Sequence, residues 1–418
     1  QPPDGNHLEE SGGDGGMKWE KVKLGDICKY VTSGGTPKSS IKEYYEPKQI
    51  PWLKTKEVNY CRIYETEAYI SKDGLDNSSA KMIPQNSVIV AMYGQGDTAG
   101  RVAINKIPLT TNQACCNLII DETKAYYEFV YYQLVTLYEK MVSLKNGGAQ
   151  PNLNAAIIKS MEIKLPPLKT QRYIADILSS YDNLIENNQK QIKLLEEAAQ
   201  RLYKEWFVDL RFPGHENTKF VDGVPEGWNW CKLEDAIQLD PKVTLTKERM
   251  KQFIPMSALS TSSMVLDESQ FTETTSNSGS KFQNGDTLLA RITPCLENGK
   301  TAYVSGIKSD EGAVGSTEYI VMRAKTINSY MVYLLARTDD FRQSAINSMS
   351  GSDGRQRVKS DKLKMLDYLH PTSELVEKFE NVEEPIFEKI YRLSKQMQQA
   401  KQARDLLLPK LMSGEVEV

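Results

Sequence analysis

Two glycine-rich segments of the sequence contain residue types that bind phosphate in nucleotide-binding proteins. Gly299-Lys300-Thr301 matches the end of a phosphate-binding loop, but such a loop needs glycine where this chain has Pro294. Residues 94–100 resemble a dinucleotide-binding loop, yet their last spacing is wrong and they lead into a strand-like segment where a helix N-terminus is required. We therefore expect no nucleotide site in either segment, and a tight hairpin connection at 94–100.

The histidines and cysteines form no pattern that would hold a metal ion or activate a nucleophile. The three histidines, His7, His215 and His370, have no catalytic or ligand partner at a useful spacing. The six cysteines form no Cys-x-x-Cys pair, which indicates reduced thiols in a cytoplasmic protein. No Asn-Pro-Pro-aromatic motif of amino-methyltransferases occurs either. We predict no catalytic residue, no metal site and no cofactor.

Side chains that recognise DNA are better represented, and they gather in glycine-flanked loops. Arginine and lysine bind phosphates and guanine, whereas asparagine and glutamine suit adenine. The predicted DNA-binding residues are Lys38, Gln95, Arg101, Gln150, Asn152, Arg291, Asn298, Lys300, Arg355, Gln356 and Arg357, and Asn154 is a further candidate. For any single side chain, a solvated loop position or a pair with a carboxylate is the simpler interpretation. For the loop 351–359 as a whole, DNA contact is favoured, because glycine-flanked basic loops allow close approach to the DNA backbone.

A long heptad-patterned stretch predicts the element that positions these loops. Residues 168–212 contain no glycine or proline, and apolar or aromatic side chains recur in them at alternating spacings of three and four. A helix over most of this stretch would be roughly 60 Å long, which suits a spacer better than a core helix. Its apolar seam needs a second helix to bury it.

The second helix is expected at the C-terminus, over residues 385–408, with Pro385 in its first turn and Pro409 just past its end. A shorter helical segment at 373–383 precedes it. The residues predicted to join the two helices are Leu178, Tyr181, Ile185, Ile192, Leu195, Leu202, Ile390, Leu393, Met397 and Leu407. Asn188 and Arg404 interrupt the seams, and each either fixes the helix register or lies exposed at a loosely packed point.

Similarities between the two halves indicate an internal duplication with an offset of roughly two hundred residues. Residues 19–26 resemble 228–235, residues 85–91 resemble 283–290, and 100–103 match 299–302. In each half a glycine-rich loop with a glutamine follows, and then a short apolar strand, a proline and a long helix. The same order at every landmark is hard to explain without duplication.

Between these landmarks, each half contains strand candidates and one clearer helix. The strands are expected at 87–92, 101–104, 116–120, 287–292, 301–304 and 318–322. The helices are expected near 126–144 and 329–347. The order of the strands in their sheets does not follow from the sequence.

Connectivity then predicts the architecture. The expected fold class is α+β, with two tandem mixed α/β domains separated by a long antiparallel two-helix coiled coil and related as a pseudo-two-fold internal repeat. We expect a disordered leader at 1–16, domains at 17–165 and 213–370, a central spacer helix at 166–212 and C-terminal spacer helices at 371–418. The domains would lie some 40–60 Å apart, about one to two turns of B-DNA.

Composition limits the possible partners of this 418-residue chain. Its net charge of −3 argues against general nucleic-acid binding by bulk charge, so any DNA contact uses local basic patches and partners that supply more positive charge. Apolar runs fall short of the roughly 18 residues that a membrane span needs, so we expect no membrane association.

From residue 17 to residue 418, the sequence resembles the specificity subunits of type I restriction–modification systems. The most specific segments are 282–302 and 404–414, together with Ser33-Gly34-Gly35-Thr36-Pro37 and Leu165-Pro166-Pro167-Leu168. Two departures from the family pattern affect only the entry into the helices. Lys169-Thr170-Gln171 stands where Glu-Gln is usual, and His370 stands where proline is common.

The resemblance implies a non-catalytic DNA-recognition subunit. Each domain would read one half of a bipartite, asymmetric site in double-stranded DNA, and the paired helices would hold the spacing. Two modification subunits, which methylate adenine with S-adenosylmethionine, would dock on the helices, and ATP-dependent restriction subunits would join that core.

Two alternative functions belong to other classes. A self-contained methyltransferase or nuclease would bind S-adenosylmethionine or modify DNA unaided. A two-headed protein-interaction scaffold would show no salt-dependent, sequence-selective DNA binding, even with modification subunits present.

Overall fold

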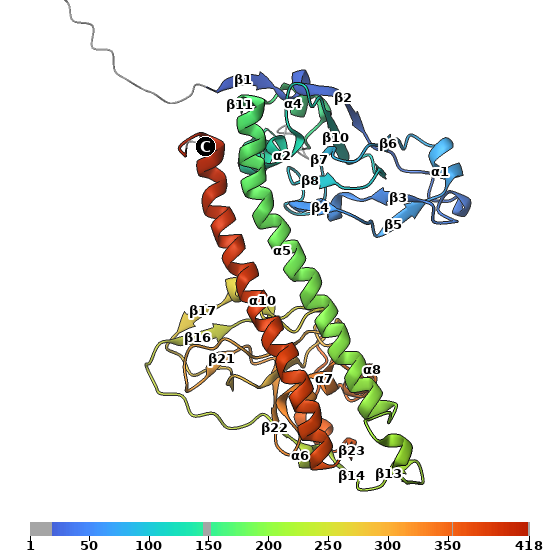
Figure 1. Cartoon of the computed structure of the whole chain (residues 1–418), viewed down its shortest axis with the longest axis vertical. Coiled ribbons are helices and arrows are strands. Elements are labelled where there is room, and N and C mark those ends of the chain that lie inside the picture. Colours follow the sequence, from blue (N-terminus) through green and yellow to red (C-terminus); the bar gives the residue numbers. More distant parts are fainter. Residues whose placement is uncertain (1–18, 145–151, 353, 417–418) are drawn as a thin grey trace, which may run out of the picture. The chain divides into compact units, whose positions relative to one another are not determined.

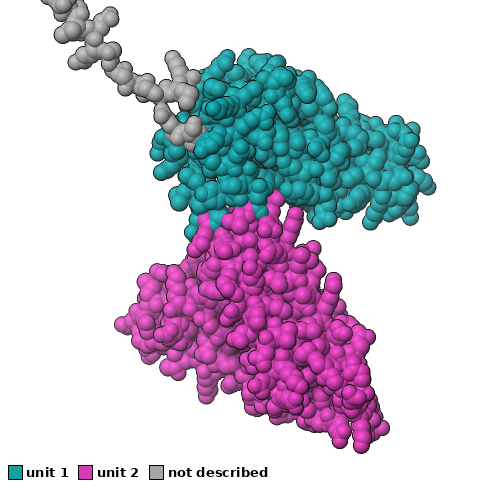
Figure 2. Space-filling view, viewed as in Figure 1, with its two compact units in different colours: residues 1–183, 400–418 teal, residues 184–399 magenta. Residues whose placement is uncertain are grey.

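The computed structural model describes residues 19–144, 152–352 and 354–416, which divide into two compact units. The first unit comprises residues 1–183 with 400–418, and the second comprises residues 184–399 (Figure 2). Two long helices, α5 (Leu168–Tyr203) and α10 (Ser373–Ser413), contribute residues to both units (Figure 1). Among the described residues, no helix is both long and apolar enough to span a membrane.

The globular part of the first unit is a mixed α/β domain. Its elements are β1 (Glu20–Lys23), β2 (Cys28–Ser33), β3 (Ile50–Leu53), β4 (Cys61–Ile63), β5 (Ala68–Ile70), α1 (Lys72–Asp76), β6 (Met82–Ile83), β7 (Val88–Ala91), β8 (Val102–Asn105), β9 (Leu109–Thr111), β10 (Cys115–Ile120), α2 (Tyr127–Thr136), α3 (Tyr138–Ser143), α4 (Ala155–Ser160) and β11 (Glu162–Leu165). The strands form sheets with the orders β2-β10-β7-β8-β4 and β5-β3-β9-β6, and β1 pairs with β11.

The globular part of the second unit has the same character. Its elements are β12 (Phe220–Val221), β13 (Val224–Pro225), β14 (Asn229–Lys232), α6 (Leu233–Ala236), β15 (Ile237–Leu239), β16 (Lys251–Ile254), β17 (Thr272–Thr274), β18 (Ser280–Phe282), β19 (Thr287–Ala290), β20 (Thr301–Tyr303), β21 (Ala313–Gly315), β22 (Tyr319–Ala324), α7 (Ser329–Arg337), α8 (Asp339–Asn347), α9 (Ser360–Lys364) and β23 (Asp367–His370). Its sheets have the orders β15-β22-β19-β20 and β17-β16-β21-β18, β14 pairs with β23, and β12 pairs with β13.

The two strand orders superimpose element by element, which confirms the internal repeat. The order β15-β22-β19-β20 matches β2-β10-β7-β8, and β17-β16-β21-β18 matches β5-β3-β9-β6. The register agrees as well, because Ala103 lies opposite Ile89 in the first unit and Ala302 lies opposite Leu288 in the second. Asn86 and Gly285 also hold the same left-handed turn, with φ of 65° and 88°. Segment 283–290 is one residue longer than segment 85–91, and this matching turn shows that the additional residue precedes Gly285.

In each unit the main sheet, a covering helix and the long helices share one apolar core. In the first unit Val90 and Leu118 of the sheet cluster with Phe129 of α2, Leu178 of α5 and Leu411 of α10. In the second unit the equivalent cluster contains Leu289 and Ile320 from the sheet, Val332 from α7, Ala199 from α5 and Phe379 from α10. Burying the apolar side of each long helix against the domain is what stabilises helices of this length.

The two long helices run antiparallel within the second unit. Asn188 lies against Leu393, whereas Tyr203, fifteen residues further along α5, packs on Phe379, fourteen residues earlier in α10. Of the predicted seam residues, Leu178, Ile185, Ile192, Ile390 and Leu393 are buried, and Tyr181, Leu195, Leu202, Met397 and Leu407 are half-buried.

Both polar residues that interrupt the seam have partners. Asn188 is buried, and its Nδ2 donates to the carbonyl of Leu393 at 3.4 Å. Arg404 forms ion pairs with Asp182 at 2.7 Å and Asp405 at 2.8 Å. The exposed, loosely packed alternative is therefore excluded for both residues.

The predicted strand boundaries are confirmed to within two residues, but several predicted helix boundaries differ from those of the structure. The helices expected near 126–144 and 329–347 are each divided in two. In the second, Thr338 accepts a hydrogen bond from the amide of Phe341 at 3.3 Å and so starts a new helix. The central helix is regular only to Tyr203 and continues as a π-helical turn at Lys204–Val208.

The C-terminal helix also differs from the prediction, because α10 continues through Pro385 and Pro409 without a break. A proline inside a helix removes one hydrogen bond and crowds the preceding turn. The buried rings of Phe379 and Phe387 lie on the two sides of Pro385 in the sequence, and their packing offsets this cost.

One buried group of α10 opposes folding. The side chain of Glu383 is fully buried, and within the described part of the chain neither carboxylate oxygen has a hydrogen-bond partner. Burial raises the pKa of this carboxyl to about 7. The folded chain therefore keeps a proton that the unfolded chain loses from about pH 4.5 upwards, so stability falls as the pH rises towards 7.

We expect Glu383→Gln to remove this pH dependence. The variant should gain about 2–3 kcal/mol in unfolding free energy over the unsubstituted chain at about pH 8, and much less at about pH 5. Urea unfolding at the two pH values measures the difference. Glu384→Gln, which changes the exposed neighbouring glutamate, is the matched control. An equal pH dependence in the unsubstituted chain and in Glu383→Gln would contradict the assignment.

Candidate nucleic-acid interface

A hairpin connection in each unit holds the first group of predicted DNA-binding residues. Residues 92–101 join β7 to β8, and residues 291–300 join β19 to β20. The amide of Ala91 donates to the carbonyl of Arg101 at 2.9 Å, and the amide of Ala290 donates to that of Lys300 at 3.1 Å. Arg101 and Lys300 therefore occupy equivalent positions. The expected strand after each segment is confirmed, and residues 94–100 lie in a hairpin connection as predicted.

Glycine is required immediately before each of these basic residues. Gly100 and Gly299 have φ of 94° and 77°, a left-handed conformation that side chains with a Cβ rarely adopt. At Gly100 an added Cβ would also lie 3.3 Å from the ring of Tyr138. The glycines thus fix the direction in which the following basic side chain leaves the hairpin.

A second segment meets the hairpin at the same place in both units. The amide of Leu153 donates to the carbonyl of Met92 at 3.1 Å, and that of Val358 donates to Arg291 at 2.9 Å. Leu153 and Val358 are both buried, so each holds its own segment against the hairpin connection. Asn152 and residues 354–357, which directly precede them in sequence, thereby lie next to the hairpin connections.

The second unit combines several basic side chains at this meeting point. Arg357 makes a two-pronged ion pair with Glu318, with Nε–Oε2 and Nη2–Oε1 distances of 2.9 and 2.7 Å. This bond with Arg357 lowers the pKa of Glu318. Nε of Arg291 donates to the carbonyl of Val358 at 3.1 Å, and Nζ of Lys300 donates to that of Met256 at 2.9 Å.

Other predicted residues of the second unit remain available to a ligand. Arg355 and Asn298 are exposed, and Gln356 is half-buried. Within the described residues, the side chain of Arg355 has no ion pair, which leaves its guanidinium free to contact DNA. Arg357 differs, because it would have to exchange Glu318 for a phosphate or a base.

The first unit shows a similar arrangement with fewer positive charges. Arg101 donates to Asn59 at 2.9 Å and to Asp97 at 2.5 Å, so its guanidinium is oriented but partly neutralised. Gln95, Lys38 and Asn152 are exposed. Lys38 lies in another loop, between β2 and β3, where Thr36 is hydrogen-bonded to Gln113.

Two further candidate positions are Gln150 and Asn154. Gln150 lies outside the described residues. Asn154 caps α4, since its Oδ1 accepts a hydrogen bond from the amide of Ile157 at 2.9 Å, which satisfies an N-terminal donor of that helix.

Sequence reasoning did not identify the residues that orient the arginines. Asp97 lies four residues before Arg101, a spacing that could have indicated the pair. Glu318 is separated from Arg357 by 39 residues, and no sequence pattern links them. Only the fold brings these two side chains together, because Glu318 directly precedes β22 beside the hairpin connection.

The geometry offers no alternative metal chemistry at this place. In the ranges that the structure describes, no group of three histidine, cysteine or acidic side chains is arranged to hold a metal ion. No disulfide joins the six cysteines, all of which lie in the described ranges, and burial raises the pKa of Cys28 and of Cys116 to about 12. At neutral pH these two thiols are therefore protonated, which is typical of structural cysteines.

Comparison with known proteins yields consistent relatives. Residues 17–197 match the family model "Type I restriction modification DNA specificity domain". The type I restriction enzyme MjaIX specificity subunit of Methanocaldococcus jannaschii is 29% identical over 417 residues, covering 96% of this chain and 94% of the relative. The EcoR124I/EcoR124II specificity subunit of Escherichia coli is 28% identical over 202 residues, covering 48% of this chain and 49% of the relative.

A solved structure shares the fold. The crystal structure of the type I restriction–modification S subunit from M. genitalium aligns over 97% of this chain and 98% of that chain, with a TM-score of 0.61 and 16% identity. By sequence, the chain is similar to type I restriction enzyme specificity subunits over almost its whole length.

Proposed function

We propose that this chain is the DNA-recognition subunit of a type I restriction–modification complex and that it reads a bipartite, asymmetric DNA site. The observation that supports the proposal is one backbone arrangement repeated in two units with different side chains, namely a hairpin connection contacted by a buried residue, Leu153 or Val358. Two equivalent backbone arrangements that carry different hydrogen-bond donors suit the reading of two different half-sites.

The domains at 17–165 and 213–370 would each act as a target-recognition domain, with 166–212 and 371–418 as spacer segments. The DNA-binding residues stay predictions, and Arg355 is the strongest because it is exposed and unpaired within the described residues. Phosphate contacts from these loops would set affinity, and amide or guanidinium contacts to base edges would set sequence preference.

The net charge of −3 supports a shared role in DNA binding. A protein that binds DNA alone usually has an excess of positive charge on its surface. We propose that two modification subunits dock on the spacer helices and complete the positive surface around DNA, and that restriction subunits join this core. The catalytic groups would reside in those partners, and the complex would act in the cytoplasm.

The loop 351–359 provides the first test. We expect Arg355→Ala combined with Arg357→Ala to weaken binding of one half-site by roughly 10- to 100-fold, because one or two charge-assisted contacts are lost. Assembly with modification subunits should be unchanged. Electrophoretic mobility shifts with DNA carrying one altered half-site at a time, at fixed salt, measure the effect.

The matched control is Arg201→Ala, which removes an exposed arginine of α5 far in sequence from the loop. Equal affinity for the cognate site in the double variant and in the unsubstituted subunit would reject the loop assignment.

The spacer helices provide the second test. Because α5 has 36 residues, it is about 54 Å long, and its pairing with α10 depends on contacts such as that of Asn188 with Leu393. Inserting four residues between positions 190 and 200 should change the permitted gap between half-sites or abolish binding. Selection of binding sites from a DNA library with random gap length measures the outcome, with four substitutions in the same segment as control. An unchanged gap would show that the helices do not set the spacing.

A further inference from the structure

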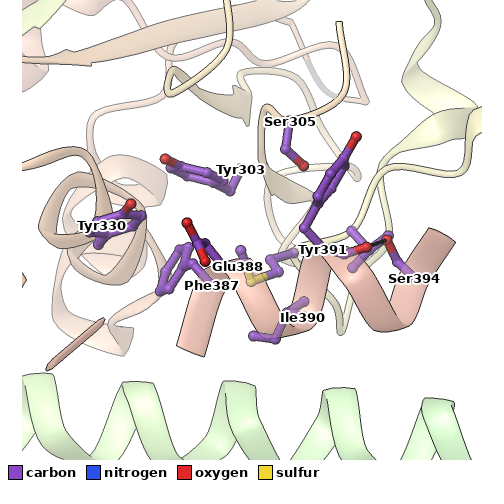
Figure 3. Close-up of a pocket in the computed structure, with 10 residues that line it drawn as sticks. Tyr303, Ser305, Tyr330, Phe387, Glu388, Ile390, Tyr391 and Ser394 are labelled. Carbon is purple, nitrogen blue, oxygen red and sulfur yellow. Dashed lines mark hydrogen bonds between the residues drawn. The ribbon is translucent and has the colours of Figure 1, made fainter. Parts of the chain in front are cut away.

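A cavity of about 180 Å³ lies in the second unit, between α10 and the globular part (Figure 3). Aromatic rings from three elements line it: Tyr303 of β20, Tyr330 of α7, and Phe387 and Tyr391 of α10. The volume is several times the ~30 Å³ that a water molecule occupies in the liquid, so the space is sufficient for a small planar or tetrahedral cationic group.

The rings support one another and are held at fixed angles. The ring centroid of Phe387 is 4.7 Å from that of Tyr330 and 5.1 Å from that of Tyr303, the latter in an edge-on arrangement. The hydroxyl of Tyr303 lies 3.1 Å from that of Ser329, which fixes the tyrosine further. Met264 and Ile390, both buried, add apolar wall.

The cavity opens next to negative charge. Glu388 lines it with a side chain that is 62% exposed, and Glu380 and Glu384 lie two turns and one turn earlier on the same side of α10. Burial is the main cause that raises the pKa of Tyr330, and the charges of Glu384 and Glu380 add to it, which places these carboxylates near the ring.

The cations around the cavity do not cancel this negative charge. Lys395 lies 5.5 Å from the ring centroid of Tyr391, but both oxygens of Glu268 bind its Nζ, at 2.6 and 2.7 Å. Arg392 reaches Glu388 only at 3.8 Å, and both side chains are mostly exposed, so their attraction is weak. Aromatic faces beside a carboxylate attract a cation and repel phosphate.

We propose that this cavity receives an arginine or lysine side chain that a partner protein inserts beside Tyr330, Phe387 and Glu388. The aromatic rings that line the cavity would hold the cation, and the carboxylate of Glu388 would accept its hydrogen bonds. The carboxylates at the opening of the cavity repel phosphate, so DNA is not the expected occupant. This contact is separate from DNA recognition and does not depend on it.

The probe is N-acetyl-arginine amide, titrated into the full chain with ¹³C-labelled methionine and isoleucine methyl groups. The methyl signals of Met264 and Ile390 should shift and saturate, and the isosteric neutral N-acetyl-citrulline amide should produce no such shift. Glu388→Gln and Tyr330→Leu should each weaken binding by roughly three- to tenfold. Should Tyr330→Leu fail to fold, the exposed Glu388→Gln change alone decides.

The matched control is Glu377→Gln, which alters another exposed glutamate of α10 that does not line the cavity; its affinity should equal that of the unsubstituted chain. An equal response to citrulline, no saturable response, or no effect of Glu388→Gln would overturn the proposal. A tighter response to spermidine than to the arginine amide would also overturn it, in favour of a free polyamine. Half-site binding should be unchanged in Glu388→Gln, so failure here is distinguishable from failure of DNA recognition.

Discussion

The pairing of α5 with α10 is the constraint on which both units depend. The core of the first unit includes Leu411 and Met412 from the end of the chain, and the core of the second includes Ile192, Ala199 and Tyr203 from α5. Neither unit completes its core from one half of the sequence alone. Because burial of apolar area is the main force that stabilises a domain, separating the helices would destabilise both units together.

Charged contacts then fix each globular part on its own portion of the helices. In the second unit Glu196 of α5 accepts hydrogen bonds from the hydroxyl of Ser263 at 2.7 Å and from the amide of Met264 at 2.8 Å. In the first unit Asp182 of α5 accepts from Tyr132 and forms the ion pair with Arg404. Directional bonds of this kind define an orientation, which apolar burial alone does not. A fixed orientation is what a DNA-reading loop requires.

The repeated loop arrangement combines a constant backbone with exposed side chains that differ between the two units. The hairpin, its glycine and the buried anchor residue are common to both units, whereas the exposed side chains differ. Arg101 faces Asn59 and Asp97 in one unit, and its equivalent Lys300 bonds to a backbone carbonyl in the other. In the proposed function, the two units would therefore read different half-sites without change to the core.

Much of this architecture was predictable because it depends on periodicity and repetition. The heptad spacing predicted α5 and the seam, and matching landmarks predicted the duplication. The breaks at Leu137 and Thr338 were not predictable, since amphipathic spacing continues through them. Pro385 misled the prediction because tertiary packing outweighs the local cost of a proline in the helix. In the candidate interface, the glycine-flanked loops were identifiable from the sequence, but the pairing of Arg357 with Glu318 depends on a contact that only the fold creates. Outside this interface, the burial of Glu383 in α10 also follows only from the fold.

The central claim is that two non-identical domains read two half-sites at a fixed gap. Methylation mapping of DNA from cells that contain this chain with its modification subunits reports motif and gap in one measurement. The account predicts a single bipartite motif with two different specified parts and a constant number of unspecified bases between them. A continuous motif, a variable gap, or methylation that is the same in cells lacking this chain would contradict it.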